Sequence, residues 1–318
     1  MKKQIAFILV LIFSLVAWAS EDINELIDKA DAGDSEAQIK VAMAYHKGDG
    51  VDRDLKKAFE YVSKSAEQGN AEAQSALAWL YIRALGVEQD YAKALEWATK
   101  AAEQNFADAQ NALTMIYYLG LDIDKDYDKA VEFAKKSAEQ NNPDGLNNLG
   151  RIYAEGLAFK ADHEKAVECW NKASDLGNAD AQNNLAYAYI EGIGVFQDYE
   201  KAFEFAEKSA TQGNADGQNI LGEIYLEGLG VEENPLKAVE WYTKAAMQRH
   251  TRAQKKLGDI CSNENLKSYN LYKAYIAYKS AEKSGYEFYD ADLDKIEKIK
   301  NKLSPEELSK AEEIIKKL

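Results

Sequence analysis

Apolar residues recur at fixed intervals along this chain, and the whole pattern repeats in turn. In the stretch Ala179–Asn214, apolar residues stand four apart at Ala181, Leu185 and Tyr189. This spacing places one apolar stripe along a helix. The pattern returns every 36 residues over most of the chain. A fixed period of this size predicts stacked helical repeats, each of which buries its apolar face against its neighbours.

Seven units of this kind follow one another, and each is predicted to form a helix, a loop and a second helix. Their expected bounds are Ser35–Asn70, Ala71–Phe106, Ala107–Asn142, Pro143–Asn178, Ala179–Asn214, Ala215–His250 and Thr251–Tyr286. The last unit departs most from the pattern. Residues 20–34 are expected to form a capping helix before the array, and residues 287–318 are expected to form capping helices after it. The fold class predicted is all-α, a right-handed α/α superhelical solenoid.

Local signals mark where the helices begin and end. In the unit that starts at Ala179, Gly192 and Gly194 supply left-handed backbone for the loop, and Asp198 stands as the N-cap of the second helix. The same N-cap recurs at Asp54, Asp90, Asp126 and Asp162. All three prolines, Pro143, Pro235 and Pro305, fall at the first position of a predicted helix, where a missing N–H costs nothing.

The first 19 residues have the form of a cleavable signal peptide. Met1-Lys2-Lys3 is basic, Ile5–Val16 is apolar, and Ala17-Trp18-Ala19 fits a cleavage site with small residues. The apolar run is shorter than the roughly 20 residues that a membrane-spanning helix needs. We therefore expect a bacterial protein that is exported to the periplasm or secreted, with no stable membrane insertion after cleavage.

The repeated residues resemble those of the Sel-like repeat (SLR) family, a relative of the tetratricopeptide repeat. The matching pattern is Ala-x-Ala-x-x-x-Leu-Gly-x-x-Tyr, then Gly-x-Gly-Val-x-x-Asp, then Lys-Ala-x-Glu-Trp-x-x-Lys-Ala-Ala, and Ala215–Ala246 carries nearly all of it. The resemblance covers Ser35–Tyr286, with Ala84 in place of the first loop glycine and no loop signature in Ser262–Asn270. It implies a superhelix that binds a protein or peptide on its concave face, as an adaptor in envelope regulation, secretion or host contact.

The helical period also predicts which positions are free to bind a partner. Opposite the apolar stripe lie unit positions 2, 5 and 9 of each first helix, and these are expected to face solvent on the concave side. Position 5 is asparagine in four consecutive units, which suits an extended peptide backbone. The candidate partner-binding residues are Trp79, Asn111, Met115, Asn147, Arg151, Asn183, Tyr187 and Asn219.

In this hypothesis Trp79 and Met115 act as anchors and Arg151 pairs with a carboxylate. The alternative is that the asparagines recur by duplication and that Trp79 packs on a neighbouring helix. The acids at position 2, from Glu36 to Asp216, are expected to complement helix N-termini. A further alternative is an envelope scaffold that uses its outer face and its C-terminal helices.

Signs of catalytic chemistry are few, and no cofactor or metal is expected. Cys169 and Cys261 lie three units apart and are expected to be buried free thiols. The three histidines are expected to be solvated or in loops, and Ser280-Ala-Glu-Lys283 lacks the partner motifs of a penicillin-binding enzyme. A formal charge of −15 argues against nucleic acid. The competing enzyme interpretation is a β-lactam-binding or hydrolysing protein, which rests on cysteine-rich relatives that carry a cysteine pair in each unit.

Overall fold

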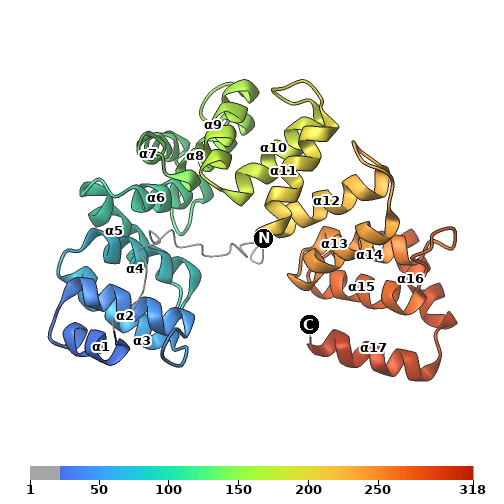
Figure 1. Ribbon diagram of the computed structural model, residues 1–318, viewed down its shortest axis with the longest axis horizontal. Coiled ribbons are helices and arrows are strands. Elements are labelled where there is room, and N and C mark those ends of the chain that lie inside the picture. Colours follow the sequence, from blue (N-terminus) through green and yellow to red (C-terminus); the bar gives the residue numbers. More distant parts are fainter. Residues whose placement is uncertain (1–21, 318) are drawn as a thin grey trace. The chain divides into compact units, whose positions relative to one another are not determined.

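The computed structural model describes residues 22–317, which contain α-helices and no strand (Figure 1). The first helices of the units, called A helices here, are α2 (Ser35–Lys47), α4 (Ala71–Arg83), α6 (Ala107–Leu119), α8 (Pro143–Glu155), α10 (Ala179–Glu191), α12 (Ala215–Glu227) and α14 (Thr251–Cys261). The second helices, called B helices, are α3 (Leu55–Glu67), α5 (Tyr91–Glu103), α7 (Tyr127–Glu139), α9 (His163–Asp175), α11 (Tyr199–Thr211), α13 (Pro235–Met247) and α15 (Leu271–Lys283). The helix α1 (Ile23–Asp31) precedes them, and α16 (Asp290–Lys302) and α17 (Pro305–Lys317) follow. The predicted signal peptide lies outside the described residues.

Helix pairing confirms the all-α solenoid. An A helix packs on the B helix of its own unit, as α4 does on α5, and on the B helix before it, as α4 does on α3. The helix α1 packs on α2 in the place of a preceding B helix, and both α16 and α17 pack on α15. Each apolar stripe is therefore covered on both sides.

The A helices lie closer to one another than the B helices do. The pairs α4 and α6, α6 and α8, and α10 and α12 are in contact. No comparable contact joins α3, α5 and α7, or α11, α13 and α15. Since A helices approach more closely, each of these stretches curves with its A helices on the inner side. The right-handed sense of the superhelix stays a prediction.

The described chain forms two compact halves, residues 22–173 and residues 174–317, and the division falls in the last turn of α9. Each half has apolar residues of the repeat pattern at its centre. In the N-terminal half Leu77 and Leu113 are fully buried, and in the C-terminal half Leu185 and Leu221 are. At roughly 25 cal/mol per Å² of buried apolar surface, these layers supply most of the driving force for folding.

Side-chain N-caps begin the helices where the sequence predicts. Asp198 Oδ1 accepts from Lys201 N at 3.0 Å to begin α11, and Asn178 Oδ1 accepts from Ala181 N at 2.8 Å to begin α10. Most A helices end on a residue with left-handed backbone, usually glycine. Ala84, which replaces the first loop glycine, adopts the same conformation with φ 55°. The loop geometry is thus kept at some steric cost.

The eroded loop of the seventh unit, residues 262–270, keeps one feature of the others. In the fifth unit, Asp198 N donates to Tyr189 O at 3.0 Å and closes the loop. In the seventh, Asn270 N donates to Cys261 O at 2.7 Å in the equivalent position. Asn270 also caps α15, because its Oδ1 accepts from Lys273 N at 2.9 Å. The helix pair α14 and α15 therefore forms without the usual loop glycines.

Candidate functional site

The surface that varies between units is a line of side chains on the A helices, at unit positions 5, 9 and 13. We call this line the A stripe. Its residues are four apart on one helix and therefore share a face. In the N-terminal half position 9 reads Met43, Trp79, Met115 and Arg151, and in the C-terminal half it reads Tyr187, Glu223 and Asp259. Unit positions 3, 7 and 11 of the same helices nearly repeat, whereas position 9 differs in most units.

In the N-terminal half, Trp79 and Met115 are partly buried against the apolar core and partly exposed. The guanidinium of Arg83 lies 4.9 Å from the centre of the Trp79 ring, four residues further along α4. Burial lowers the pKa of Arg83, although an arginine keeps its charge at neutral pH. This stretch of the A stripe therefore presents an aromatic ring and a cation together.

Arg151 lies in a small polar cluster between α6 and α8. Its Nη2 donates to the Tyr118 hydroxyl at 3.2 Å, its guanidinium lies 5.1 Å from the centre of that ring, and Glu155 is 4.0 Å away. The Tyr118 hydroxyl donates to Glu155 in turn. Burial and this bond raise the pKa of Tyr118 to about 12. Arg151 is thus held in place while part of its side chain faces solvent.

The expectation that the asparagines of position 5 face solvent is wrong for three of the four. Asn111, Asn147 and Asn219 are buried, and Asn183 is half-buried. Asn111 Oδ1 accepts from Asn148 Nδ2 on the next A helix at 2.7 Å. The reason is the close approach of neighbouring A helices, which covers position 5. Tyr187, in contrast, is 52% exposed, so its predicted solvent exposure is confirmed.

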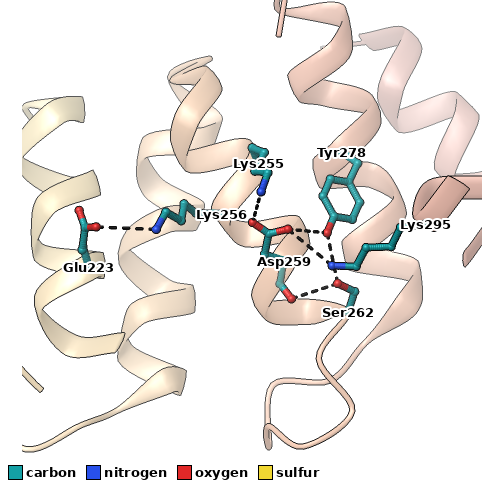
Figure 2. Close-up of polar contacts among 7 residues, drawn as sticks. All are labelled: Glu223, Lys255, Lys256, Asp259, Ser262, Tyr278 and Lys295. Carbon is teal, nitrogen blue, oxygen red and sulfur yellow. Dashed lines mark hydrogen bonds and ion pairs between the residues drawn. The ribbon is translucent and has the colours of Figure 1, made fainter. Parts of the chain in front are cut away.

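A polar cluster in the C-terminal half, centred on Asp259, was not predicted from the sequence (Figure 2). Asp259 Oδ2 lies 2.7 Å from Lys255 Nζ, and its Oδ1 accepts from the Tyr278 hydroxyl at 2.8 Å. Lys295 Nζ of α16 is 3.6 Å from the same carboxylate. Ser262 Oγ is 3.2 Å from the Tyr278 hydroxyl and donates to the Asp259 carbonyl at 3.0 Å. The negative charge of the carboxylate is therefore paired with two lysine amines, and its contacts join α14, α15 and α16.

The sequence contains one signal for this cluster, two unit positions whose residue types vary together from unit to unit. Where unit position 28 on the B helix is aromatic, position 8 on the A helix is glycine. The pairs are Gly150 with Trp170, Gly222 with Tyr242 and Gly258 with Tyr278. In the other units the pairs are Ala42 with Val62, Ala78 with Ala98, Thr114 with Ala134 and Ala186 with Ala206. Without a Cβ at position 8, the ring reaches the A-helix layer, where the Trp170 indole N–H donates to Asn147 O at 3.3 Å.

Pairs of glutamines join the layers at one end of the helices and were also not predicted. Five of the six buried glutamines at unit position 4 accept from a glutamine that follows the B helix, at 2.7–2.9 Å, and Gln254 is the exception. The pairs, acceptor first, are Gln38–Gln68, Gln74–Gln104, Gln110–Gln140, Gln182–Gln212 and Gln218–Gln248. The amide of Gln74 also donates to Ala66 O at 3.2 Å. These residues hold the repeats together rather than face a ligand.

The acids of unit position 2 take part in the same layer contacts. Asn142 and Asn214, which cap α8 and α12, donate to Asp108 and Asp180 of the preceding A helix. His250 lies in the loop between α13 and α14, as expected. There it caps α14 and places Nε2 2.9 Å from Asp216, in a position that asparagine holds in other units.

Neither thiol belongs to a reactive site. Cys169 and Cys261 are both free, as expected, although Cys169 is only partly buried. Burial raises the pKa of Cys169 to about 11 and also raises that of Cys261, so neither is a ready nucleophile at neutral pH. The described residues hold no group of three His, Cys, Asp or Glu placed to bind a metal. None of the helices between residues 22 and 317 is long and apolar enough to span a bilayer.

Comparison with known proteins agrees with this architecture. The sequence profile of the Sel1 repeat matches residues 35–70, 71–106, 107–142, 143–178, 179–214 and 215–250. The crystal structure of c5321, a protective antigen present in uropathogenic Escherichia coli strains and displaying an SLR fold, is similar with a TM-score of 0.55 and 29% identity, over 92% of this chain and 70% of that one. A Sel1 repeat protein from Oxalobacter formigenes gives a TM-score of 0.61 and 28% identity, over 71% of this chain and 97% of that one. Yeast Tom70, at 13% identity and a TM-score of 0.50 over 88% of this chain and 57% of that one, is similar in fold alone. No curated protein matches the sequence.

Proposed function

We propose that this chain, which belongs to the Sel1 repeat family, is an exported scaffold that binds a protein partner through its A stripe. Proteins of this family are helical repeat scaffolds that commonly mediate protein–protein interaction. The observation that carries the proposal is the contrast between positions on one helix. Stacking positions repeat from unit to unit, whereas position 9 changes from methionine to tryptophan, arginine, tyrosine and acids. Positions that only pack against neighbouring helices keep similar residues in every unit, so this variation favours a binding role for position 9.

The mechanism would be display of side chains on a rigid frame. Helix pairs hold successive position 9 side chains at repeat spacing, so an extended partner meets them without a large loss of protein entropy. In the N-terminal half, Trp79 and Met115 would supply apolar area, and Arg83 and Arg151 would supply cations. This half therefore fits a segment that carries apolar and acidic residues. Asn111 and Asn147, being buried, would act by fixing neighbouring helices rather than by direct contact.

Export is part of the same proposal. The basic, apolar and small-residue regions of the first 19 residues support it, although they lie outside the described structure. The similar protein c5321 is described as a protective antigen, which fits a protein presented outside the cytoplasm. The periplasm or the cell exterior is therefore where the partner would be met.

The test begins with crosslinking in the native envelope, followed by mass spectrometry and purification of the partner. Trp79→Ala should then weaken binding at least tenfold, because truncating a central aromatic anchor costs about 2 kcal/mol or more. Trp97→Ala, the same change on the B helix α5 of that unit, is the matched control and should leave the Kd within about twofold. Equal binding by the wild-type, Trp79→Ala and Arg151→Ala chains would overturn the proposal for this surface.

A further inference from the structure

A cavity of about 680 Å³ lies beside the loops of the third and fourth units, within the N-terminal half. Its apolar lining consists of Leu95 of α5, Tyr117 of α6, Ile123 and Tyr127 at the start of α7, and Leu157 and Ala158 of the loop after α8. Leu157 is 38% exposed, so this lining is open to solvent. Ligand sites in proteins span roughly 300–1,000 Å³. None of these residues belongs to the A stripe, so the cavity is a separate candidate for binding.

The loss of one loop glycine accounts for the cavity. The second loop glycine, at unit position 16, packs against the start of the preceding B helix, and a Cβ on Gly86 would meet Leu55 O at 1.9 Å. In the fourth unit, position 16 is Ala158, and the preceding B helix begins at Tyr127. The Cβ of this alanine keeps the loop from closing on the backbone at Tyr127 as the glycine loops do. Both residues line the space that is left.

The backbone of the fourth loop also differs from that of the other loops. At unit position 16, Gly86 and Gly230 have φ 74° and φ 69°, and Asp122 of the third unit keeps this left-handed region with φ 54°. Ala158 does not adopt it. Left-handed backbone is unfavourable for a residue with a Cβ, so the fourth loop follows another path. The opening is therefore built into this unit by its sequence.

The charged residues that line the cavity are three aspartates and two lysines, namely Asp124, Lys125, Asp126, Asp128 and Lys129. Asp126 is engaged, because its Oδ1 caps α7 and its Oδ2 lies 3.4 Å from Lys129 Nζ. Lys125 Nζ lies over an aromatic ring of the lining, 5.9 Å from the ring centre. Asp124 and Asp128 are exposed, and neither forms an ion pair with another residue between 22 and 317. The charge left over at the cavity is therefore negative.

We propose that this cavity binds a segment of a partner protein in which an apolar side chain stands next to a lysine or an arginine. The apolar side chain enters between Tyr127 and Ala158 and covers apolar surface that otherwise faces water. The neighbouring cation pairs with Asp124 and Asp128. An acidic segment is disfavoured by the same carboxylates and by the formal charge of −15 on the whole chain.

The probe is a fluorescein-labelled hexapeptide in which leucine and lysine alternate, and fluorescence anisotropy follows its binding to the purified chain. In one matched peptide serine replaces leucine, and in another glutamine replaces lysine. The leucine–lysine peptide should bind at least tenfold more tightly than the serine peptide, because only the former buries apolar side chains. It should bind at least threefold more tightly than the glutamine peptide, which lacks the cations. Equal affinity for either matched peptide would overturn the proposal.

Paired variants separate this cavity from the net charge of the chain. Asp124→Asn with Asp128→Asn should weaken binding of the leucine–lysine peptide at least threefold. The control, Glu232→Gln with Glu200→Gln, makes the same change of charge on exposed residues at the same unit positions, 18 and 22. These glutamates lie where Gly230 packs on the start of the preceding B helix, so the control should have little effect. An equal loss in both double variants would assign the binding to general attraction and reject the cavity.

Two further measurements locate the peptide. Ala158→Trp fills the cavity and should weaken binding at least tenfold, with circular dichroism to check that the variant folds. If it does not fold, the aspartate pair decides. Peptide binding should slow amide hydrogen exchange in residues 121–129 and 156–160 and leave residues 193–201 unchanged. Protection that omits the first two segments would overturn the proposal. Failure of the peptide to bind would reject this site and leave the A stripe proposal standing, since the two surfaces share no residue.

Discussion

The ring of Tyr278 lies against the backbone of Gly258, so close that a Cβ on that glycine would meet the ring at 2.6 Å. The contact lets the phenol hydroxyl pass the A helix and reach Asp259 at 2.8 Å. The same relationship links Gly222 with Tyr242, where a Cβ would meet the ring at 3.0 Å. Glycine at this position is therefore required by the side chain that faces it rather than by backbone conformation.

Gly258→Ala is expected to lower the free energy of unfolding by about 1–3 kcal/mol, because the added methyl overpacks the layer. Tyr278→Ala is expected to cost about 3–5 kcal/mol through the cavity that it leaves. The double variant recreates the alanine pair of Ala78 and Ala98 and should cost at least about 1 kcal/mol less than the sum. Urea unfolding of the four chains measures this coupling. Strictly additive costs would show that the two residues do not form one packing unit.

The two glutamines of a pair are expected to contribute unequally to the free energy of unfolding. Gln74→Ala should cost about 2 kcal/mol, because it leaves Ala66 O and the Gln104 amide without the bonds that Gln74 makes. Gln104→Ala should cost about 1 kcal/mol, since its own side chain is exposed. Thermal unfolding compares both with Glu103→Ala, a neighbouring exposed control expected to stay within about 0.5 kcal/mol of wild type. The reverse order for the two glutamines would contradict the assignment.

Phe106 is a weak point at the start of α6. It occupies the N-cap and provides no side-chain hydrogen bond, whereas Asn142 in the next unit caps α8 with a 2.8 Å bond to Gly145 N. Phe106→Asn is expected to raise the free energy of unfolding by about 1 kcal/mol, the usual contribution of an N-cap. Differential scanning calorimetry should show a higher Tm, with Asn142→Ala as the opposite control. A lower Tm for Phe106→Asn would mean that the phenyl ring contributes more by packing than a cap can supply.

Stability should fall in acid because of the aspartate caps. Hydrogen bonds from backbone N–H groups hold the pKa of Asp90, Asp126, Asp162 and Asp198 below its ordinary value of 3.8. A carboxylate whose pKa is lower in the folded state stabilises the fold above its unfolded pKa, and this stabilisation is lost as the pH falls through the folded pKa. The Tm of the wild type should therefore drop steeply as the pH falls below about 4.

A chain with asparagine at all four positions should show a shallower drop, since asparagine caps without titrating. Asn234 already does so in the sixth unit, where its Oδ1 accepts from Lys237 N at 3.1 Å. Circular dichroism melts at pH 6 and pH 3 compare the two chains. Parallel losses of Tm in both would assign the acid sensitivity to other carboxylates.

We expect the purified chain to turn over no chromogenic cephalosporin above the buffer rate. Ser280 of the Ser-x-x-Lys sequence is buried and donates to Ile276 O at 2.6 Å. The Lys283 amine donates instead to the carbonyls of Ile315 and Lys316, at 2.8 and 3.1 Å. Serine and lysine are therefore each engaged elsewhere and form no nucleophile and base pair. Saturable turnover that a Ser280→Ala chain loses would restore the enzyme interpretation.

The sequence by itself determined the repeat, the helices and their caps. These depend on neighbours within a few residues, such as Asp198 and Lys201 at the start of α11 or Asn234 before Pro235, and a linear pattern records such contacts directly. The same holds for the variable position 9, where Tyr187 is exposed as the helical period predicts. Repetition strengthens each signal, because every unit tests it again.

Only the tertiary structure decided which of these faces is open. The helical period predicts the direction in which Asn111 points from the axis of its own helix. It does not predict where the next A helix lies, and the approach of that helix buries Asn111 against Asn148. The layer contacts of Gly258 with Tyr278 and of Gln74 with Gln104 likewise join residues 20 and 30 positions apart. Such contacts exist only once the units have stacked.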